Sequence, residues 1–193
     1  HVRRAERVGS NPAFFNLEKL EWMNGQHMRL LPEAERVRRV AAYLATRGHD
    51  LAARPPEWGE ALVRAIGDRL KTLADAERYG VFALRDALEV DPDAWAGLRE
   101  KPEVGPRLAE LGRRLDADPE FSLASLERET RQLALELGIK PGELMGATRV
   151  ALTGRTVAPG LFEVMALLGR ERTVARLRAA AQRWAEESPH AQV

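Results

Sequence analysis

The chain has 193 residues, which is enough for one sizeable hydrophobic core or two small ones. It contains no cysteine, which excludes disulfide bonds, thiolate zinc sites and cysteine nucleophiles. Its 30 Lys and Arg residues nearly balance its 29 Asp and Glu residues, so a site for nucleic acid would have to be a local feature of the surface.

The sequence indicates neither membrane insertion nor secretion. No apolar run approaches the roughly 20 residues that a membrane-spanning helix needs. The first residues, His-Val-Arg-Arg, lack the apolar segment of a signal peptide. We therefore expect a soluble, cytoplasmic protein without a membrane partner. Histidine rather than methionine at position 1 favours a chain that is part of a longer protein.

The first predicted helix is short. Asn16 is suited to cap it, residues 17–24 form it, and Gly25 ends it in the C′ position. Trp22 lies beside leucines at helical spacing, so we expect it in the core rather than stacked on RNA. The stripe that should face inward is Leu17, Leu20 and Met23.

Proline begins the next two predicted helices. Pro32 is the first residue of one that runs to Gly48. Pro56 begins the other, on which Arg64 and Arg69 both fall. The apolar side of this helix is Trp58, Leu62, Ala65, Ile66, Leu70 and Leu73. A buried cluster should follow, formed by Tyr79, Val81, Phe82 and Leu84.

Start signals of the same kind recur in the second half of the chain. Asp91-Pro92 combines an N-cap with a favoured first residue, Pro106 opens the next helix, and Asp118-Pro119 repeats the start signal. Gly138 occupies a C′ position. The remaining helices are expected around residues 143–145, 161–168 and 173–186.

These patterns predict an all-α protein. No segment alternates β-branched and polar residues in the way that strands do, and a composition rich in Ala, Leu, Arg and Glu favours helix throughout. We expect two consecutive helical subdomains, residues 32–84 and 85–193, which follow a connecting segment, residues 1–31, with one short helix.

The stretch from Thr148 to Gly169 carries the strongest functional signal. Arg149 and Arg155 lie on either side of a turn made of small residues, and an apolar helix opens directly after it. Free N–H groups at that helix N-terminus, together with two guanidinium groups, would suit a nucleobase or a phosphate. The alternative is an ordinary loop with two solvated arginines. The residues small enough to allow close backbone approach are Gly154, Ala158 and Gly160.

Basic residues are concentrated in the same region. Between residues 148 and 183 only Glu163 and Glu171 oppose the cations. This local excess supports a nucleic-acid surface, while a solvated basic helix face is the common alternative. The cations concerned are Arg149, Arg155, Arg170, Arg172, Arg176, Arg178 and Arg183.

The sequence holds no catalytic motif. Its histidines, at positions 1, 27, 49 and 190, have no partner at metal-ligand spacing, and no phosphate-binding loop or nucleophile motif occurs. Carboxylate pairs such as Glu18 with Glu21 lie among basic residues, as solvated faces do. We therefore expect no catalytic residue, no metal site and no cofactor in this chain, which disfavours an independent enzyme.

Two segments near opposite ends of the chain carry a family resemblance. The first, from Asn11 to Arg29, reads Asn-Pro-Ala-Phe-Phe-Asn-Leu-Glu-Lys-Leu-Glu-Trp-Met-Asn-Gly-Gln-His-Met-Arg. The second comprises Arg149-Val-Ala-Leu-Thr-Gly, Pro159-Gly-Leu-Phe-Glu-Val and Leu167-Leu-Gly-Arg-Glu-Arg. They resemble, respectively, the segment that joins the two halves of bacterial glutamyl-tRNA synthetases and the C-terminal signature of that class I aminoacyl-tRNA synthetase family. Between them the likeness lies in order and helix pattern.

The resemblance implies a helix cage that receives the anticodon loop of tRNA. Residues 1–31 would then end the stem-contact segment, and the two predicted subdomains would form the cage. The implied partner is tRNA for glutamate, with tRNA for glutamine left open, and the implied oligomeric state is a monomer. A Rossmann catalytic half that uses ATP and Mg²⁺ is implied for the parent glutamate–tRNA ligase, and its motifs are absent from this sequence.

The resemblance also assigns residues. Arg149 matches an arginine that contacts anticodon bases, and Ala158 stands where family members have threonine, so that one hydroxyl donor is missing. Arg69 best matches the arginine that favours tRNA for glutamate over tRNA for glutamine at the third anticodon base, and Arg64 is the other candidate. The expected anticodon-binding set is Arg149, Arg69, Arg155, Ala158, Pro159, Leu161 and Phe162.

Two other interpretations stay open at this point. The chain could be a free-standing RNA-binding protein derived from the synthetase tail, which a neighbouring reading frame for the Rossmann half would argue against. It could instead be a helical protein-interaction scaffold with incidental arginines, which an absence of tRNA binding at low salt would favour.

Overall fold

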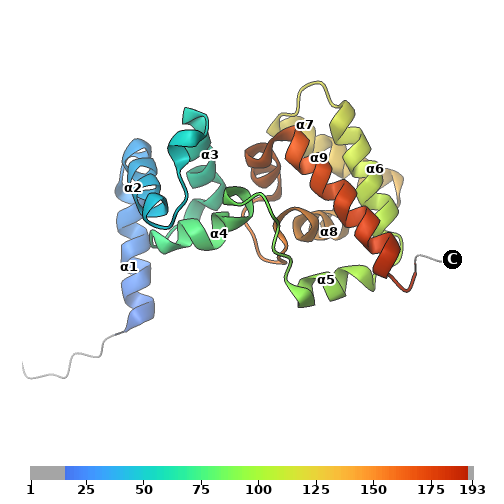
Figure 1. Ribbon diagram of the computed structural model, residues 1–193, viewed down its shortest axis with the longest axis horizontal. Coiled ribbons are helices and arrows are strands. Elements are labelled where there is room, and N and C mark those ends of the chain that lie inside the picture. Colours follow the sequence, from blue (N-terminus) through green and yellow to red (C-terminus); the bar gives the residue numbers. More distant parts are fainter. Residues whose placement is uncertain (1–15, 191–193) are drawn as a thin grey trace, which may run out of the picture.

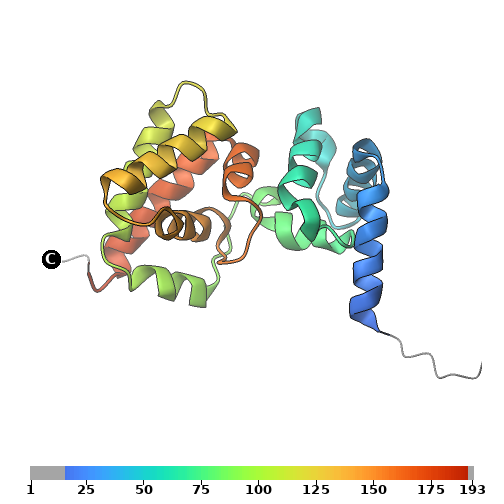
Figure 2. The same ribbon diagram turned by 180° about the vertical axis from the view of Figure 1, so that it is seen from behind.

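The structure, a computed structural model, describes residues 16–190, and within them it contains helices and turns without a strand, which confirms the all-α prediction. Two lobes lie side by side (Figure 1), and the view from behind shows the same separation (Figure 2). The first lobe comprises α1 (Leu17–Leu30), α2 (Glu33–Thr46), η1 (Leu51–Ala53), α3 (Pro56–Ile66), η2 (Gly67–Arg69) and α4 (Ala74–Leu84). The second comprises α5 (Pro92–Arg99), α6 (Val104–Ala117), α7 (Leu123–Glu136), α8 (Pro141–Thr153) and α9 (Leu161–Glu187).

Helix α1 differs from its prediction. It passes through Gly25 and continues to Leu30, because Gly25 is buried against Lys71 and an added Cβ would lie 3.2 Å from the Lys71 side chain. The Asn24 amide donates to the Lys71 carbonyl at 2.5 Å, which holds α1 against the segment that follows η2. The glycine therefore permits a close approach instead of ending the helix. The expected inward stripe and the core position expected for Trp22 are both wrong, since the large apolar side chains exposed on α1 are Leu17, Leu20, Trp22, Met23 and Leu30.

The core of the first lobe lies among α2, α3 and α4. Helix α2 begins at Glu33, one residue later than expected, with Pro32 as its N-cap. Helix α3 ends at Ile66, where Gly67 adopts a φ of +55°, so Arg69 falls in η2 and not on the helix of Arg64. The fully buried apolar residues here include Val40, Leu44, Leu62, Val63, Ile66, Leu70 and Phe82. Of the predicted cluster around Phe82, the half-buried members are Tyr79, Val81 and Leu84.

Helices α6 and α9 form the centre of the second lobe because small residues let them approach closely. An added Cβ at Gly105 would lie 2.4 Å from the Trp184 ring, and one at Gly112 would lie 3.4 Å from Leu177. Gly169, with a φ of +74°, breaks α9 into two helical segments, which agrees with the two helices predicted around residues 161–168 and 173–186.

Helix starts in this lobe are confirmed in part. Asp91 caps α5 by accepting from the Ala94 N–H at 2.9 Å, as predicted. Helix α6 begins two residues before Pro106, at Val104. Helix α8 is much longer than the short helix expected around residues 143–145 and includes Arg149.

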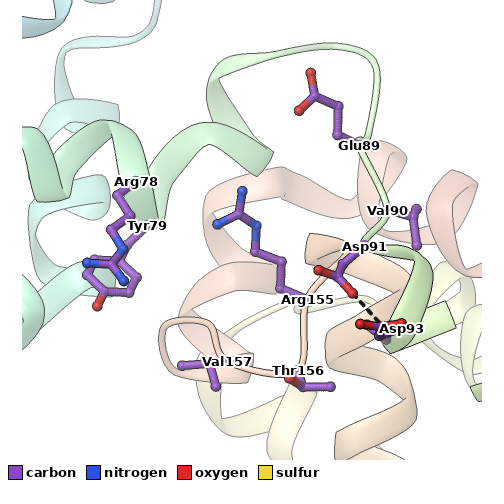
Figure 3. Close-up of a pocket in the computed structure, with 10 residues that line it drawn as sticks. Arg78, Tyr79, Glu89, Val90, Asp91, Asp93, Arg155, Thr156 and Val157 are labelled. Carbon is purple, nitrogen blue, oxygen red and sulfur yellow. Dashed lines mark hydrogen bonds between the residues drawn. The ribbon is translucent and has the colours of Figure 1, made fainter. Parts of the chain in front are cut away.

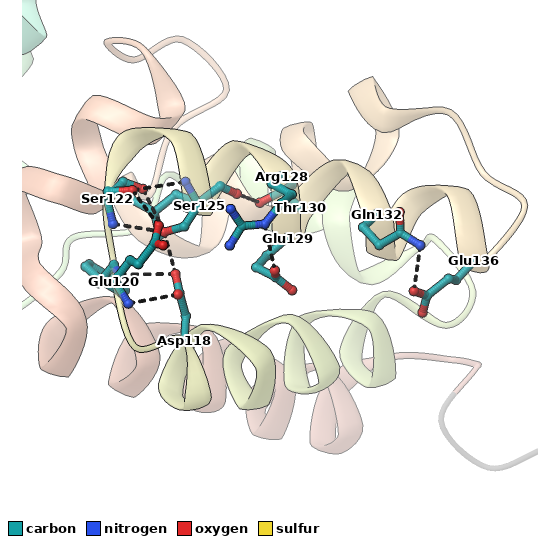
Figure 4. A network of polar contacts seen from close by, with 11 residues as sticks. Asp118, Glu120, Ser122, Ser125, Arg128, Glu129, Thr130, Gln132 and Glu136 are labelled. Carbon is teal, nitrogen blue, oxygen red and sulfur yellow. Dashed lines mark hydrogen bonds and ion pairs between the residues drawn. The ribbon is translucent and has the colours of Figure 1, made fainter.

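The start predicted at Asp118-Pro119 is wrong. Asp118 follows the end of α6, and α7 begins at Leu123 with Ser122 as its cap. The Asp118 carboxylate is buried and accepts hydrogen bonds from the Ser125 hydroxyl at 2.5 Å and from the N–H groups of Glu120 and Phe121 (Figure 4). It thus ties the connection to the first turn of α7 instead of starting a helix.

Asp118→Ala is expected to lower the free energy of unfolding by about 2 kcal/mol at neutral pH, because these donors lose a charged acceptor. Burial would raise the pKa of Asp118, but the hydrogen bonds from Ser125, Glu120 and Phe121 outweigh burial and hold it below its ordinary value of 3.8. A carboxyl with a lowered folded pKa stabilises the fold above its ordinary value and loses that contribution as pH falls through the lowered one. Urea unfolding should therefore give a difference that shrinks below pH 3.8, and a pH-independent difference would contradict this account.

Arginines of α9 join the two lobes. Arg172 donates to the carbonyls of Ala83 and Arg85, and Arg176 donates to Phe82 at 2.8 Å, all near the C-terminal end of α4. These bonds satisfy carbonyl groups that a helix end leaves free. They also fix α4 relative to the second lobe.

The domain boundary predicted between residues 84 and 85 stays a prediction, and residues 1–15 of the connecting segment lie outside the described residues. None of the helices within residues 16–190 combines the length and the apolar character that crossing a bilayer requires.

Candidate nucleic-acid interface

A cleft of about 770 Å³ opens between the lobes (Figure 3). Helix α4 contributes one wall, and the segment that leads into α5 and the loop after α8 contribute the other. The side chain of Arg155 extends from its loop into the space between these walls. The lining residues are Arg78, Tyr79, Glu89, Val90, Asp91, Asp93, Ala94, Arg155, Thr156 and Val157.

The loop that carries Arg155 is held by its backbone. Gly154 ends α8 with a φ of +71°, and its carbonyl accepts from the Asp91 N–H at 2.9 Å. The Thr153 hydroxyl donates to the Arg149 carbonyl at 2.8 Å and accepts from the Arg155 N–H at 3.3 Å. Arg155 is exposed, so a fixed backbone presents a free side chain to the cleft.

A second cavity of about 430 Å³ adjoins the first and shares Arg78 and Tyr79 with it. Arg69 lines this second cavity beside Lys71. The structure therefore brings Arg69 and Arg155 to neighbouring hollows on one surface, although they lie far apart in the sequence.

The arginines at these cavities differ from the others in their partners. The side chains of Arg69, Arg78 and Arg155 make no hydrogen bond or ion pair with another residue in the range 16–190, and all three line the two cavities. Arg36 and Arg149, which do not line these two cavities, also make no side-chain hydrogen bond or ion pair within residues 16–190. Free guanidinium groups gathered at one surface are available to bind an anionic ligand.

The basic C-terminal end predicted from the sequence is mostly structural. Arg170 donates to the carbonyls of Leu115 and Asp116, and Arg183 pairs with Glu187. Arg176 is only 9% exposed, and burial lowers its pKa to about 10, which leaves it charged at neutral pH. These cations hold the fold together instead of forming an open basic face.

Carboxylates give the first cavity a mixed charge. Glu89 pairs with Arg85 at 2.5 Å, and Asp91 caps α5. Asp93 makes no ion pair within the described residues and is exposed at the first turn of α5. The α4 wall therefore carries the cation Arg78, and the opposite wall carries Arg155 together with these carboxylates.

The remaining predicted site residues lie outside these cavities. Arg149 is half-buried on α8, in the turn before Gly154. Ala158, Pro159 and Leu161 are buried in the second lobe. Phe162 is partly buried and packs against the core. The Glu163 carboxylate lies against Gly160, at the helix N-terminus that the sequence suggested for a ligand.

Sequence reasoning missed Arg78 and Tyr79. The Arg78 guanidinium lies over the Tyr79 ring, 5.3 Å from its centroid. The sequence predicts Tyr79 in a buried cluster. The spacing of charged residues in the sequence does not show that Arg78 lacks an acidic partner. An arginine next to an aromatic residue was the signal available. Within residues 16–190, no three His, Asp or Glu side chains are placed to share a metal ion.

Comparison with known proteins gives consistent matches. A family model described as an anticodon binding domain matches residues 28–181. Proteins named glutamate–tRNA ligase are 41% identical over 183 residues in Roseiflexus castenholzii, 35% over 187 in Moorella thermoacetica and 37% over 174 in Mycobacterium marinum. These alignments cover 91%, 95% and 90% of this chain, and 35%, 38% and 35% of the relatives. The chain thus spans somewhat over a third of their length.

Solved structures share the fold. A glutamate tRNA ligase from Elizabethkingia meningosepticum, crystallised in complex with its amino acid, superposes with a TM-score of 0.76 at 21% identity, over 87% of this chain and 32% of that one. The glutamate–tRNA synthetase of Elizabethkingia anophelis gives a TM-score of 0.71 at 19% identity, with the same coverage. At these identities the likeness concerns the helical architecture.

Proposed function

The chain belongs to the anticodon-binding domain family, and from this premise we propose that it is the tRNA-binding portion of a glutamate–tRNA ligase. Its ligand would be the anticodon loop of tRNA for glutamate, as the names of the relatives suggest. Catalysis with ATP and Mg²⁺ would belong to a Rossmann half that this chain does not include. The chain would act as a monomer together with that half.

The observation that carries the proposal is the gathering of free arginines, Arg69, Arg78 and Arg155, at adjoining cavities between the lobes. An unstacked loop offers bases and phosphates that side chains can reach, whereas the major groove of an RNA duplex is too narrow. Guanidinium groups bind phosphates and the edges of bases such as guanine. A surface of this kind suits a single-stranded loop better than a duplex.

We assign base contacts to Arg149 and to the loop of Ala158, Pro159, Leu161 and Phe162, and selection at the third anticodon base to Arg69. Ala158, Pro159 and Leu161 are buried, and Phe162 is partly buried, where the loop leads into α9. The side chain of Arg149 is half-buried and makes no hydrogen bond or ion pair within the described residues, so it would not have to break one to contact a base.

In a filter-binding titration, the chain should bind tRNA for glutamate more tightly than an unrelated tRNA. Arg149→Ala should weaken binding to tRNA for glutamate by roughly 5- to 150-fold, equivalent to about 1–3 kcal/mol for a lost base contact. Arg155→Ala should weaken binding to both tRNAs and lower the salt dependence by about one counterion, as a lost phosphate contact does. Transfer RNA for glutamine serves as the third ligand, and Arg69→Ala should reduce any preference between it and tRNA for glutamate.

Arg131→Ala is the matched control, because Arg131 is an exposed arginine on α7 that pairs with Glu127 at 2.7 Å. It removes the same charge away from the cavities and should leave binding nearly unchanged. Equal losses for Arg149→Ala and Arg131→Ala would refute the role of Arg149. No binding of any tRNA at low salt would refute the proposed function and favour a protein-interaction scaffold.

A further inference from the structure

We propose that Arg78 and Tyr79 form a stacking platform for one unpaired RNA base, whose phosphate faces Arg155 and whose amino edge faces Asp93. The inference rests on the proposed function and adds a nucleotide subsite between the lobes. It differs from the anticodon contacts assigned above, because none of Arg78, Tyr79 and Asp93 belongs to that set.

The structure contains the contact on which the platform depends. The Arg78 guanidinium lies 5.3 Å from the centroid of the Tyr79 ring, within the range of a cation–π contact. Tyr79 is half-buried and packs against the core of the first lobe, whereas Arg78 is exposed. The core therefore holds the ring, the ring supports the guanidinium group, and both residues line the cleft.

Such a surface is chemically suited to a nucleobase. Unpaired bases in RNA complexes stack on aromatic rings or on the planes of arginine side chains. Arg78 makes no ion pair within the described residues, so stacking would not displace an acidic partner. A cleft of about 770 Å³ falls in the range of pockets that enclose small organic ligands, which leaves room for a nucleotide.

The charges of Arg155 and Asp93, which lie on the wall opposite Arg78 and Tyr79, set the orientation. Arg155 reaches into the cleft from the loop after α8, and the free carboxylate of Asp93 lies on the α5 side (Figure 3). A phosphate is attracted by Arg155 and repelled by Asp93. A carboxylate can accept a hydrogen bond from the exocyclic amino group of cytosine, and uracil has no such donor. The subsite should therefore prefer cytosine to uracil.

The test measures fluorescence anisotropy of labelled oligocytidylate and oligouridylate, each about ten nucleotides long, with tRNA for glutamate as a separate ligand. Arg78→Ala and Arg78→Lys should both weaken oligocytidylate binding about tenfold, since lysine keeps the charge but lacks the planar group. Tyr79→Phe should retain binding because the ring remains. Asp93→Ala should bring the affinities for the two oligonucleotides closer together.

Arg131→Ala again controls for loss of a positive charge, and thermal unfolding of every variant controls for loss of structure. Wild-type affinity of Arg78→Lys for oligocytidylate would overturn the platform, because charge alone would then account for Arg78. An unchanged preference for oligocytidylate in Asp93→Ala would overturn the orientation. If the chain binds tRNA for glutamate while all Arg78 variants bind normally, only the platform fails. If the unaltered chain binds no RNA, the proposed function fails with it.

Discussion

Replacing Arg176 by methionine is expected to lower the free energy of unfolding by about 3 kcal/mol, because buried carbonyl groups lose a charged donor. Arg176 is 9% exposed and donates to the Leu152 carbonyl at 2.7 Å and to the Phe82 carbonyl at 2.8 Å. A longer contact of 3.5 Å reaches the carbonyl of Arg85. Methionine fills much of the same space but donates to none of them. Urea unfolding of the two proteins measures the difference.

Arg178→Met is the matched control, since it makes the same substitution two residues further along α9. The Arg178 side chain is 61% exposed and pairs with Asp116 at 2.6 Å, and exposed pairs of this kind contribute under about 1 kcal/mol. Similar losses of stability for the two variants would show that the carbonyl contacts of Arg176 contribute little.

The direction of the pKa shift of Arg176 determines how its contribution to stability depends on pH. Burial lowers the pKa of Arg176 from its ordinary value to about 10, so the folded protein releases this proton at a lower pH than the unfolded chain does. Stability due to this group therefore rises with pH between those two values and is constant below them. The destabilisation by Arg176→Met should accordingly be the same at any pH between weakly acidic and weakly alkaline.

Arg176 also matters for the cleft between the lobes. It bonds to the end of α4 near Phe82 and to the end of α8 at Leu152, and these two helices carry or adjoin the cavity residues Tyr79 and Arg155. Arg176→Met should therefore weaken binding of tRNA for glutamate at a temperature at which the variant is still folded. Binding equal to that of Arg178→Met would argue that the walls of the cleft are held by other contacts.

The sequence predicted the helical class and many helix ends because these depend on local chemistry. Asp91 caps α5 and Gly138 ends α7 with a φ of +66°, as their neighbours in the chain indicate. Identical local signals failed where a distant contact decided the outcome. Gly25 has the pattern of a helix end, but it lies inside α1, where its missing side chain leaves room for Lys71. Asp118 has the pattern of an N-cap, but it follows the end of α6 and accepts a hydrogen bond from Ser125 in the first turn of α7.

The candidate site was predictable only in part for the same reason. The loop position of Arg155 follows from the small residues around it, which are visible in the sequence, whereas Arg69 was expected on the helix of Arg64 and lies in η2. The partners of a cation are not visible there, so Arg170 and Arg183 resembled Arg155 until their carbonyl and carboxylate partners were known. Tyr79 has the spacing of a core residue, and only its neighbour Arg78 distinguishes it as a wall of the cleft.

Gly154→Ala should be the most damaging single-methyl change in the candidate site, at a cost of about 4 kcal/mol. The residue has a φ of +71°, which disfavours any side chain, and an added Cβ would lie 2.2 Å from the Glu89 carbonyl oxygen and 2.9 Å from the Val90 Cα. These are backbone atoms, so a rotamer change cannot relieve the clash. The loop must move, which threatens the bond between the Gly154 carbonyl and the Asp91 N–H.

Gly138→Ala separates the two causes of this loss. Gly138 has a φ of +66° at the end of α7, but an added Cβ would meet nothing within 4 Å, so only the backbone strain of about 1 kcal/mol remains. Urea unfolding should thus give a much lower free energy of unfolding for Gly154→Ala than for Gly138→Ala. Because Arg155 follows Gly154 directly, the first variant should also lose affinity for tRNA for glutamate under conditions in which it is folded, and the second should not. Equal stabilities would mean that the contact between the α8 loop and residues 89–91 is loose, and an Arg155 on a loose loop could not be held toward a bound phosphate.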